Sequence, residues 1–133
     1  MSLTTKQLSS NGILIKGMDT VTGKELISLI TNIYEDTETY TANDFGFNDF
    51  SGITKLDITT EQVAKIAKLN LQYHRANPEY RIVTYTTSDL VFGLSRMWTS
   101  YLGSEGPKTY LARDKDKAVE WLSAELDREI TLR

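Results

Sequence analysis

Apolar and polar positions recur with two different periods along this chain of 133 residues, and the change of period marks its strands and helices. Short runs rich in β-branched, aliphatic and aromatic residues predict strands at Ile13–Lys16, Gly46–Ile53, Tyr80–Tyr85 and Lys108–Ala112. Asn11-Gly12 is a turn signal, because both residues tolerate positive φ, and it predicts a hairpin with an additional strand. That strand is expected at residues 3–8, and the second strand is expected to end at Gly17.

Longer segments carry apolar residues three and four positions apart, which is the spacing of one helix face. They predict helices over residues 22–34, from Thr59 to about residue 76, over residues 89–102, and from Asp114 through residue 126. Thr22 with Glu25 and Thr59 with Gln62 have the spacing of a capping box, in which each side chain satisfies a free amide of the first turn. Trp98, Trp121 and Leu94 fall on the apolar faces of their helices and are expected to be buried.

Two segments interrupt this order. Residues 35–45 show no clear period and contain four carboxylates, so a solvated acidic loop is expected there. Gly52-Ile53-Thr54 is expected to turn the chain out of the third strand. The remaining alternation of strands and helices predicts an α/β fold, a single domain over 1–133, with a mixed, mainly parallel sheet of about five strands and about four helices.

Composition narrows the function. Apolar residues make up 40% and charged residues 25% of the chain, and its formal net charge is −3, which argues against a broad nucleic-acid surface. The sequence has no cysteine, so it has no disulfide, thiol nucleophile or thiolate metal site. Its longest apolar runs are too short for a membrane span or a signal peptide, and a cytoplasmic location is expected.

Candidate chemistry is sparse. Asp49 and Asp57 could be imagined as an acid–base pair, but surface carboxylates are the simpler interpretation. His74 is the only histidine, and its place near a helix end favours packing and dipole complementarity over catalysis or metal binding. We therefore expect no catalytic residue, no metal site and no cofactor.

The helix at 89–102 has a second face that a core helix does not need. Phe92 and Arg96 lie one turn apart on it, with Gly93 and Ser100 as small neighbours, and an aromatic residue with an arginine is typical of a protein contact. We expect this face to form a homodimer, since a two-fold contact is the commonest way for one chain to supply the opposing surface. The competing interpretation is that the first hairpin or the segment after Leu126 covers Phe92.

Three stretches together resemble a known family. Asp89–Trp98, then Ala118–Leu122, with Asn48–Thr54 before them, are similar to the helix, following helix and central strand of the SpoIIAA-like family of small bacterial proteins. The resemblance covers most of the chain from about Gly12, and its motifs are largely core-forming. It implies a fold like the STAS domain of anti-sigma-factor antagonists and like lipid-binding SEC14-type domains.

The resemblance also implies a regulatory position. In the antagonists an Asp-Ser-Ser-Gly segment carries a phosphoserine at a helix start, and the matching stretch here is Asp57-Ile58-Thr59-Thr60. The aspartate is retained, Thr59 stands at the serine position, and Thr60 replaces the glycine. Because loops at the carboxyl ends of parallel strands converge, we expect a ligand or regulatory site at Asp57, Thr59, Thr87 and Ser88.

These observations favour a non-enzymatic regulatory or protein-binding module of STAS-like type. A carrier of a small apolar or lipid-like ligand is the alternative, consistent with seven tyrosines, four phenylalanines and two tryptophans. An enzyme ranks last, because no nucleophile–base or metal constellation is visible.

Overall fold

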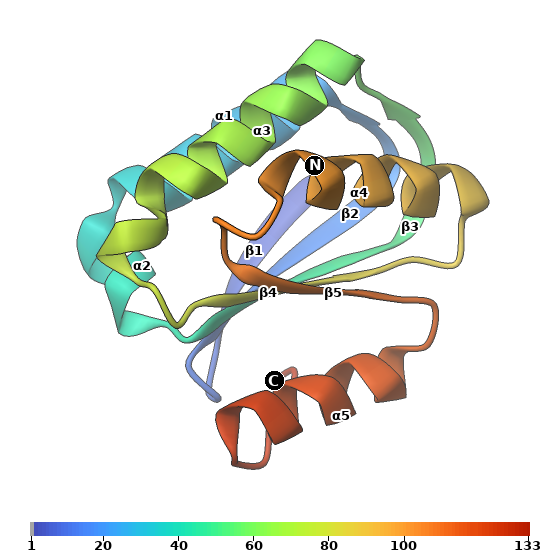
Figure 1. Cartoon of the computed structure of the whole chain (residues 1–133). Coiled ribbons are helices and arrows are strands. Elements are labelled where there is room, and N and C mark those ends of the chain that lie inside the picture. Colours follow the sequence, from blue (N-terminus) through green and yellow to red (C-terminus); the bar gives the residue numbers. More distant parts are fainter. Residues whose placement is uncertain (1) are drawn as a thin grey trace.

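A five-stranded mixed sheet lies at the centre of the computed structural model, which describes residues 2–133 (Figure 1). The strands lie in the order β1-β2-β3-β4-β5. β1 pairs with β2 in an antiparallel hairpin, and the other three ladders are parallel. The expected α/β class, single sheet and strand count are therefore confirmed. The strands are β1 (Leu3–Leu8), β2 (Gly12–Thr22), β3 (Phe45–Asp57), β4 (Arg81–Tyr85) and β5 (Lys108–Ala112).

The ladder between β2 and β3 is longer than the sequence predicts. β2 continues past Gly17 to Thr22, and β3 continues through Gly52 to Asp57, so both predicted strand ends are wrong. The two glycines lie inside strands, where neighbouring atoms occupy the space of a side chain. A Cβ at Gly17 would lie 2.7 Å from the Cδ1 of Ile53, and one at Gly52 would lie 2.9 Å from a backbone oxygen. Register shifts accompany them, so these glycines mark bulges and not turns.

The helices begin at the predicted caps. The hydroxyl of Thr22 accepts a hydrogen bond from the amide of Glu25, and the same reciprocal box is present at Thr59 and Gln62. Ser88 caps α4 and Asp114 caps α5. The helices are α1 (Gly23–Glu35), α2 (Thr37–Ala42), α3 (Thr60–Tyr73), a 3₁₀ turn η1 (His74–Ala76), α4 (Asp89–Leu102) and α5 (Lys115–Leu126).

The expected acidic loop at residues 35–45 is wrong in part, because it contains α2. Asp36 ends α1 and begins α2: its backbone amide bonds to the carbonyl of Asn32, and its carboxylate accepts from the amide and hydroxyl of Thr39. One carboxylate of the presumed loop is thus a helix cap. The short helix places Tyr40 and Asn43 in the interior.

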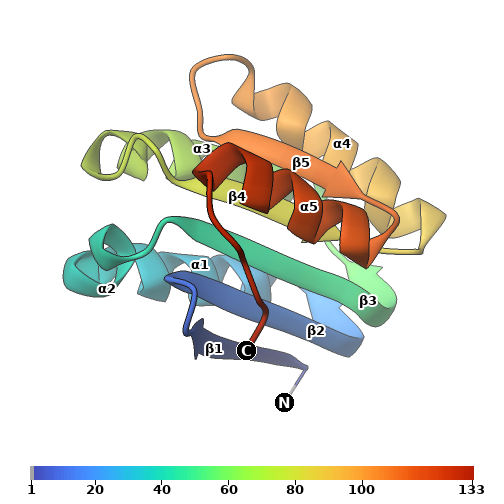
Figure 2. The ribbon, with the colours of Figure 1, turned by 90° about the horizontal axis from the view of Figure 1, so that it is seen from below.

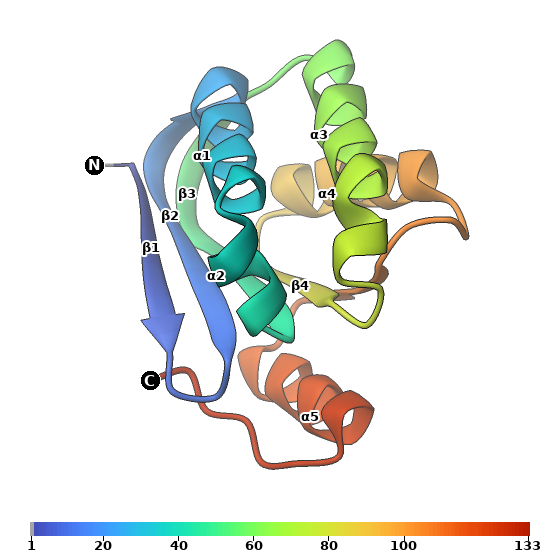
Figure 3. The same ribbon diagram turned by 90° about the vertical axis from the view of Figure 1, so that its left-hand side faces the viewer.

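The helices cover the sheet unequally. α1, α3 and α4 lie on one face, with α1 and α3 side by side, and α5 alone covers the other (Figures 1 and 3). Two apolar clusters follow: one includes Ile15, Val63 and Trp98 beneath the three helices, and the other includes Phe47 and Leu122 beneath α5. None of the helices within residues 2–133 is both long and apolar enough to cross a bilayer.

The segment after α5 runs back across the sheet to the β1–β2 turn (Figure 2). The amide of Ser9 donates to the carbonyl of Arg133 at 2.8 Å, and the amide of Thr131 donates to the hydroxyl of Ser10. Ile130 is buried with Leu8 in the α5-side cluster. This segment therefore covers the hairpin end of the sheet that α5 does not reach.

The two tryptophans differ in burial. Trp98 is 9% exposed and its indole N–H donates to the side-chain oxygen of Asn70 at 2.8 Å. Trp121 is partly exposed and packs against the α5-side cluster, so it is less buried than Trp98. Its ring stacks on Tyr110 of the edge strand β5, with centroids 5.2 Å apart, and no strand lies beyond β5 to cover it.

We expect the core beneath α5 to contribute strongly to stability. Leu122→Ala removes a side chain that is 0% exposed and leaves a cavity between α5 and the sheet, which costs about 2–5 kcal/mol. Urea unfolding measures this difference. Leu90→Ala is the matched control, since Leu90 is 61% exposed and the change is expected to cost no more than about 0.5 kcal/mol. Equal losses in the two variants would contradict the placement of α5.

Candidate functional site

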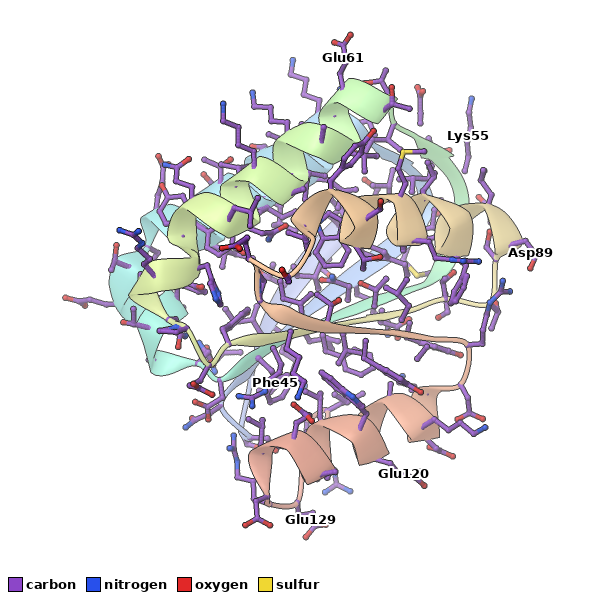
Figure 4. The ribbon with its side chains drawn as sticks, viewed as in Figure 1. Phe45, Lys55, Glu61, Asp89, Glu120 and Glu129 are labelled. Atoms are coloured by element: carbon purple, nitrogen blue, oxygen red, sulfur yellow. The ribbon has the colours of Figure 1, made fainter. Side chains whose placement is uncertain are left out.

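The predicted regulatory residues lie at the carboxyl ends of the parallel strands. Figure 4 labels neighbours of these residues: Lys55 and Glu61 at its upper edge and Asp89 at its right edge. Asp57 is the last residue of β3, and Thr59 is the N-cap of α3. Both side chains are exposed. Thr59 is therefore accessible to a modifying enzyme or to a partner.

Two helix N-termini meet beside Thr59. Thr22, which begins α1, is the ladder partner of Asp57. A Cβ on Gly23 would overlap the side-chain amide of Gln62, so the first turns of α1 and α3 are in direct contact. The helix dipoles leave partial positive charge at the N-termini of α1 and α3, which favours an anion near them.

The capping boxes already occupy some of the backbone amides that could bind an anion. The amide of Gln62 donates to the Thr59 hydroxyl oxygen at 3.1 Å, and the amide of Thr59 donates to the Gln62 side chain at 3.0 Å. A phosphate on Thr59 would add a strong acceptor at the α3 N-terminus, but beside the carboxylates of Asp57 and Glu61. Such a group would change the charge of the surface at the start of α3.

Thr87 and Ser88 do not join this site. β3 pairs with β4 only as far as Asp49, and then continues with β2 to Asp57, whereas β4 ends at Tyr85. The hydroxyl of Ser88 is used as the α4 cap, accepting from the amide of Val91 at 3.3 Å. The extension of β3 therefore separates the four candidates into two groups, each at its own helix start.

The proposed interface residues lie on α4. Gly93, Arg96 and Ser100 are exposed, and a Cβ at Gly93 would meet nothing within 4 Å. Phe92 is half-buried beneath the Arg113 guanidinium, whose carbon lies 4.1 Å from the ring centroid. The competing interpretation placed the hairpin or the C-terminal segment over Phe92, but the hairpin lies at the opposite edge of the sheet from β5, and the C-terminal segment bonds to the β1–β2 turn. Its cover comes from the residue that follows β5.

α4 carries an apolar stripe beside its core face, and the sequence pattern alone did not distinguish the two. Leu90 is 61% exposed and Tyr101 47% exposed, with half-buried Leu94 and Met97 between them. The core side of the helix is instead formed by Val91, Trp98 and Leu102. The stripe makes α4 apolar over a wider arc than the core requires.

Asp49 is the residue whose environment differs most from expectation. Its side chain is not on a surface loop but is 5% exposed on the α5 face of the sheet. Ser51 donates from its hydroxyl at 2.6 Å and from its amide at 3.1 Å, and the Lys115 ammonium lies 3.3 Å away. Burial alone would raise the pKa of Asp49, but the Ser51 hydrogen bonds and the Lys115 charge together lower it. Asp57 projects from the end of β3, so the two aspartates form no acid–base pair.

The side chains that could bind a metal ion, among them the only histidine, do not form a cluster in the part of the chain that the structure describes. Within residues 2–133, no group of three His, Cys, Asp or Glu side chains is placed to hold a metal ion. His74 lies at the C-cap of α3, and its buried Nδ1 has no hydrogen-bond partner among the described residues. This position agrees with the expected helix-end location.

We expect Asp49 to make stability depend on acid pH. A carboxylate whose pKa is lowered in the folded state stabilises the fold above its unfolded pKa, near 3.9, and loses that contribution as pH falls through the folded value. Asp49→Asn should cost about 1–3 kcal/mol at pH 7, measured by urea unfolding, with a smaller difference from wild type below pH ~4. Asp57→Asn is the control, since that side chain is exposed. A cost at pH 7 no larger than that of the control would contradict this account.

No protein-family model matches the chain, and no curated protein matches it by sequence. The anti-sigma factor antagonist SpoIIAA in its unphosphorylated form is similar in structure, with a TM-score of 0.59 and 9% identity over 90% of this chain and 96% of that one. The Bacillus cell fate determinant SpoIIAA in its phosphorylated form gives a TM-score of 0.50 and 11% identity, over 90% and 98%. The chain therefore has the STAS-like fold of SpoIIAA.

Proposed function

We propose that this chain is a non-enzymatic regulatory module that binds a partner protein. The observation that supports it is the fold, which over 90% of the chain is similar to a protein described as an anti-sigma factor antagonist. Two exposed surface features could take part in such binding. Thr59 is exposed at the start of α3, and the apolar stripe of α4 extends into solvent at Leu90 and Tyr101.

The two features have separate roles in this proposal. Exposed aromatic and aliphatic side chains supply the apolar centre of a protein contact. Thr59 supplies control, since a phosphate there would place about −1.5 to −2 charge next to Asp57 and Glu61. Binding of an acidic or apolar partner surface would weaken after such a modification.

The test uses the anti-sigma factors of the source organism, each titrated into the purified chain by calorimetry. We expect one of them to bind, and Leu90→Asp to weaken binding at least tenfold. Met18→Asp is the matched control, because Met18 is a 45% exposed apolar side chain on β2. Binding that is equally sensitive to both changes would place the contact away from α4, and absence of binding to every anti-sigma factor would refute the antagonist role.

Charge at Thr59 is tested separately. Thr59→Glu introduces a negative group at the α3 N-terminus, and Thr59→Gln is the uncharged control of similar size. We expect the first to weaken partner binding at least threefold more than the second. If both variants bind like wild type, Thr59 has no regulatory role.

We also propose that the outer face of α4 forms a homodimer. Gly93, Arg96 and Ser100 are exposed on this face, and no neighbouring atom within the described residues requires Gly93 to lack a side chain. Sedimentation at tens of micromolar should give a wild-type dimer and a folded monomer for Gly93→Glu with Arg96→Glu. A wild-type monomer would refute the dimer, and a dimer that survives both changes would place its interface elsewhere.

A further inference from the structure

A cavity of about 110 Å³ lies between the sheet and the three helices on its α1 side. Strands β2, β3 and β4 form its floor, and α1, α3 and α4 form its walls. Most of the half-buried lining residues come from α1, the end of β3 with its following loop, and α4, and Asn48 on the floor is half-buried as well. These residues include Ile30, Ile33, Leu56, Ile58 and Leu94.

The lining contains no charged side chain and no histidine among the residues that the structure describes. Moving an ion into such surroundings without a partner costs far more than a small apolar contact returns. A buried carboxylate, phosphate or ammonium group therefore does not fit. The occupant must be uncharged.

One hydrogen-bonding point lies on the cavity floor. Asn48 and Thr84 are ladder partners on β3 and β4, and the Asn48 amide donates to the Thr84 hydroxyl oxygen at 3.2 Å. The Thr84 hydroxyl proton and the Asn48 carbonyl oxygen have no partner among the hydrogen bonds of residues 2–133. Together they form one donor and one acceptor that face the same space.

Several other polar lining groups are already hydrogen-bonded. The Asn70 side chain donates to the Tyr34 hydroxyl at 2.6 Å and accepts from the Trp98 indole at 2.8 Å. The Ser95 hydroxyl donates to the carbonyl of Val91 at 2.8 Å. These bonds hold the walls, whereas the Asn48–Thr84 pair and the Tyr80 hydroxyl, which has no partner among the hydrogen bonds of residues 2–133, are available to a ligand.

Size limits the ligand further. An engineered apolar cavity of about 150 Å³ stays dry and binds benzene. The cavity here is somewhat smaller and is open on one side, so it fits one ring or a short branched chain.

We propose that this cavity binds a small uncharged ligand with a single-ring or short-chain apolar body and one hydroxyl or carbonyl group. The body contacts the aliphatic walls, and the polar group pairs with Asn48 and Thr84. This site lies between the sheet and the helical layer, and Leu94 belongs both to its wall and to the apolar stripe of α4.

Benzyl alcohol is the probe, with benzoate as its charged counterpart, each titrated into ¹⁵N-labelled protein and followed by amide chemical shifts. We expect saturable shifts on β3, β4, α1 and α4 with benzyl alcohol, and at least tenfold weaker binding of benzoate. Thr84→Val keeps the shape but removes the hydroxyl, and should weaken benzyl alcohol about threefold to tenfold. Scattered, non-saturating shifts would overturn the proposal.

Filling the cavity gives an independent test. Leu94→Phe adds volume at the wall and should weaken benzyl alcohol at least tenfold, while Leu126→Phe makes the same change in a half-buried residue at the end of α5, on the other face of the sheet, and should not. Ile33→Phe is the second filling variant, for use if Leu94→Phe does not fold. Wild-type affinity in a folded filling variant, or equal loss in Leu126→Phe, would overturn the proposal.

Discussion

The parallel ladder between β2 and β3 is the constraint on which the rest of the fold depends. It joins the antiparallel hairpin to the parallel strands. It also continues past the point where the pairing of β3 with β4 ends. Because α1 begins where β2 ends and α3 begins just after β3 ends, this one ladder brings both helices to the same corner. The paired capping boxes at Thr22 and Thr59, the exposed Thr59 hydroxyl and the upper wall of the cavity all follow from it.

Local signals in the sequence predicted the elements well where each signal acts on its own neighbours. Capping boxes at Thr22 and Thr59 depend only on residues three positions away, and both are present. Glycine was less informative, since Gly17 and Gly52 have the composition of turns but occupy bulges, which depend on a neighbouring strand. The helix α2 was missed because a short polar run capped by Asp36 has no apolar period to detect.

The same difference between local and long-range signals applies to the candidate site. Placement of Thr59 at a helix start was predictable from spacing, but its separation from Thr87 and Ser88 was not, because strand length sets that distance. Asp49 could not be recognised as buried, since its partner Lys115 comes from a helix sixty-six positions later. The cavity is a property of six packed elements, and no single stretch of sequence contains it.

The register shifts in the β2–β3 ladder have a mechanical consequence. Past these bulges the ladder is a two-stranded ribbon without support from β4, and such ribbons twist more easily than wider sheets. α1 and α3 are both attached at its far end, whereas α4 is attached to the shorter β4. A bend at the bulges would therefore move the first turns of α1 and α3 together, while the hydrogen bond from Trp98 of α4 to Asn70 holds the last part of α3 to α4. The corner that carries Thr59 and the entrance to the interior would then move on the same hinge.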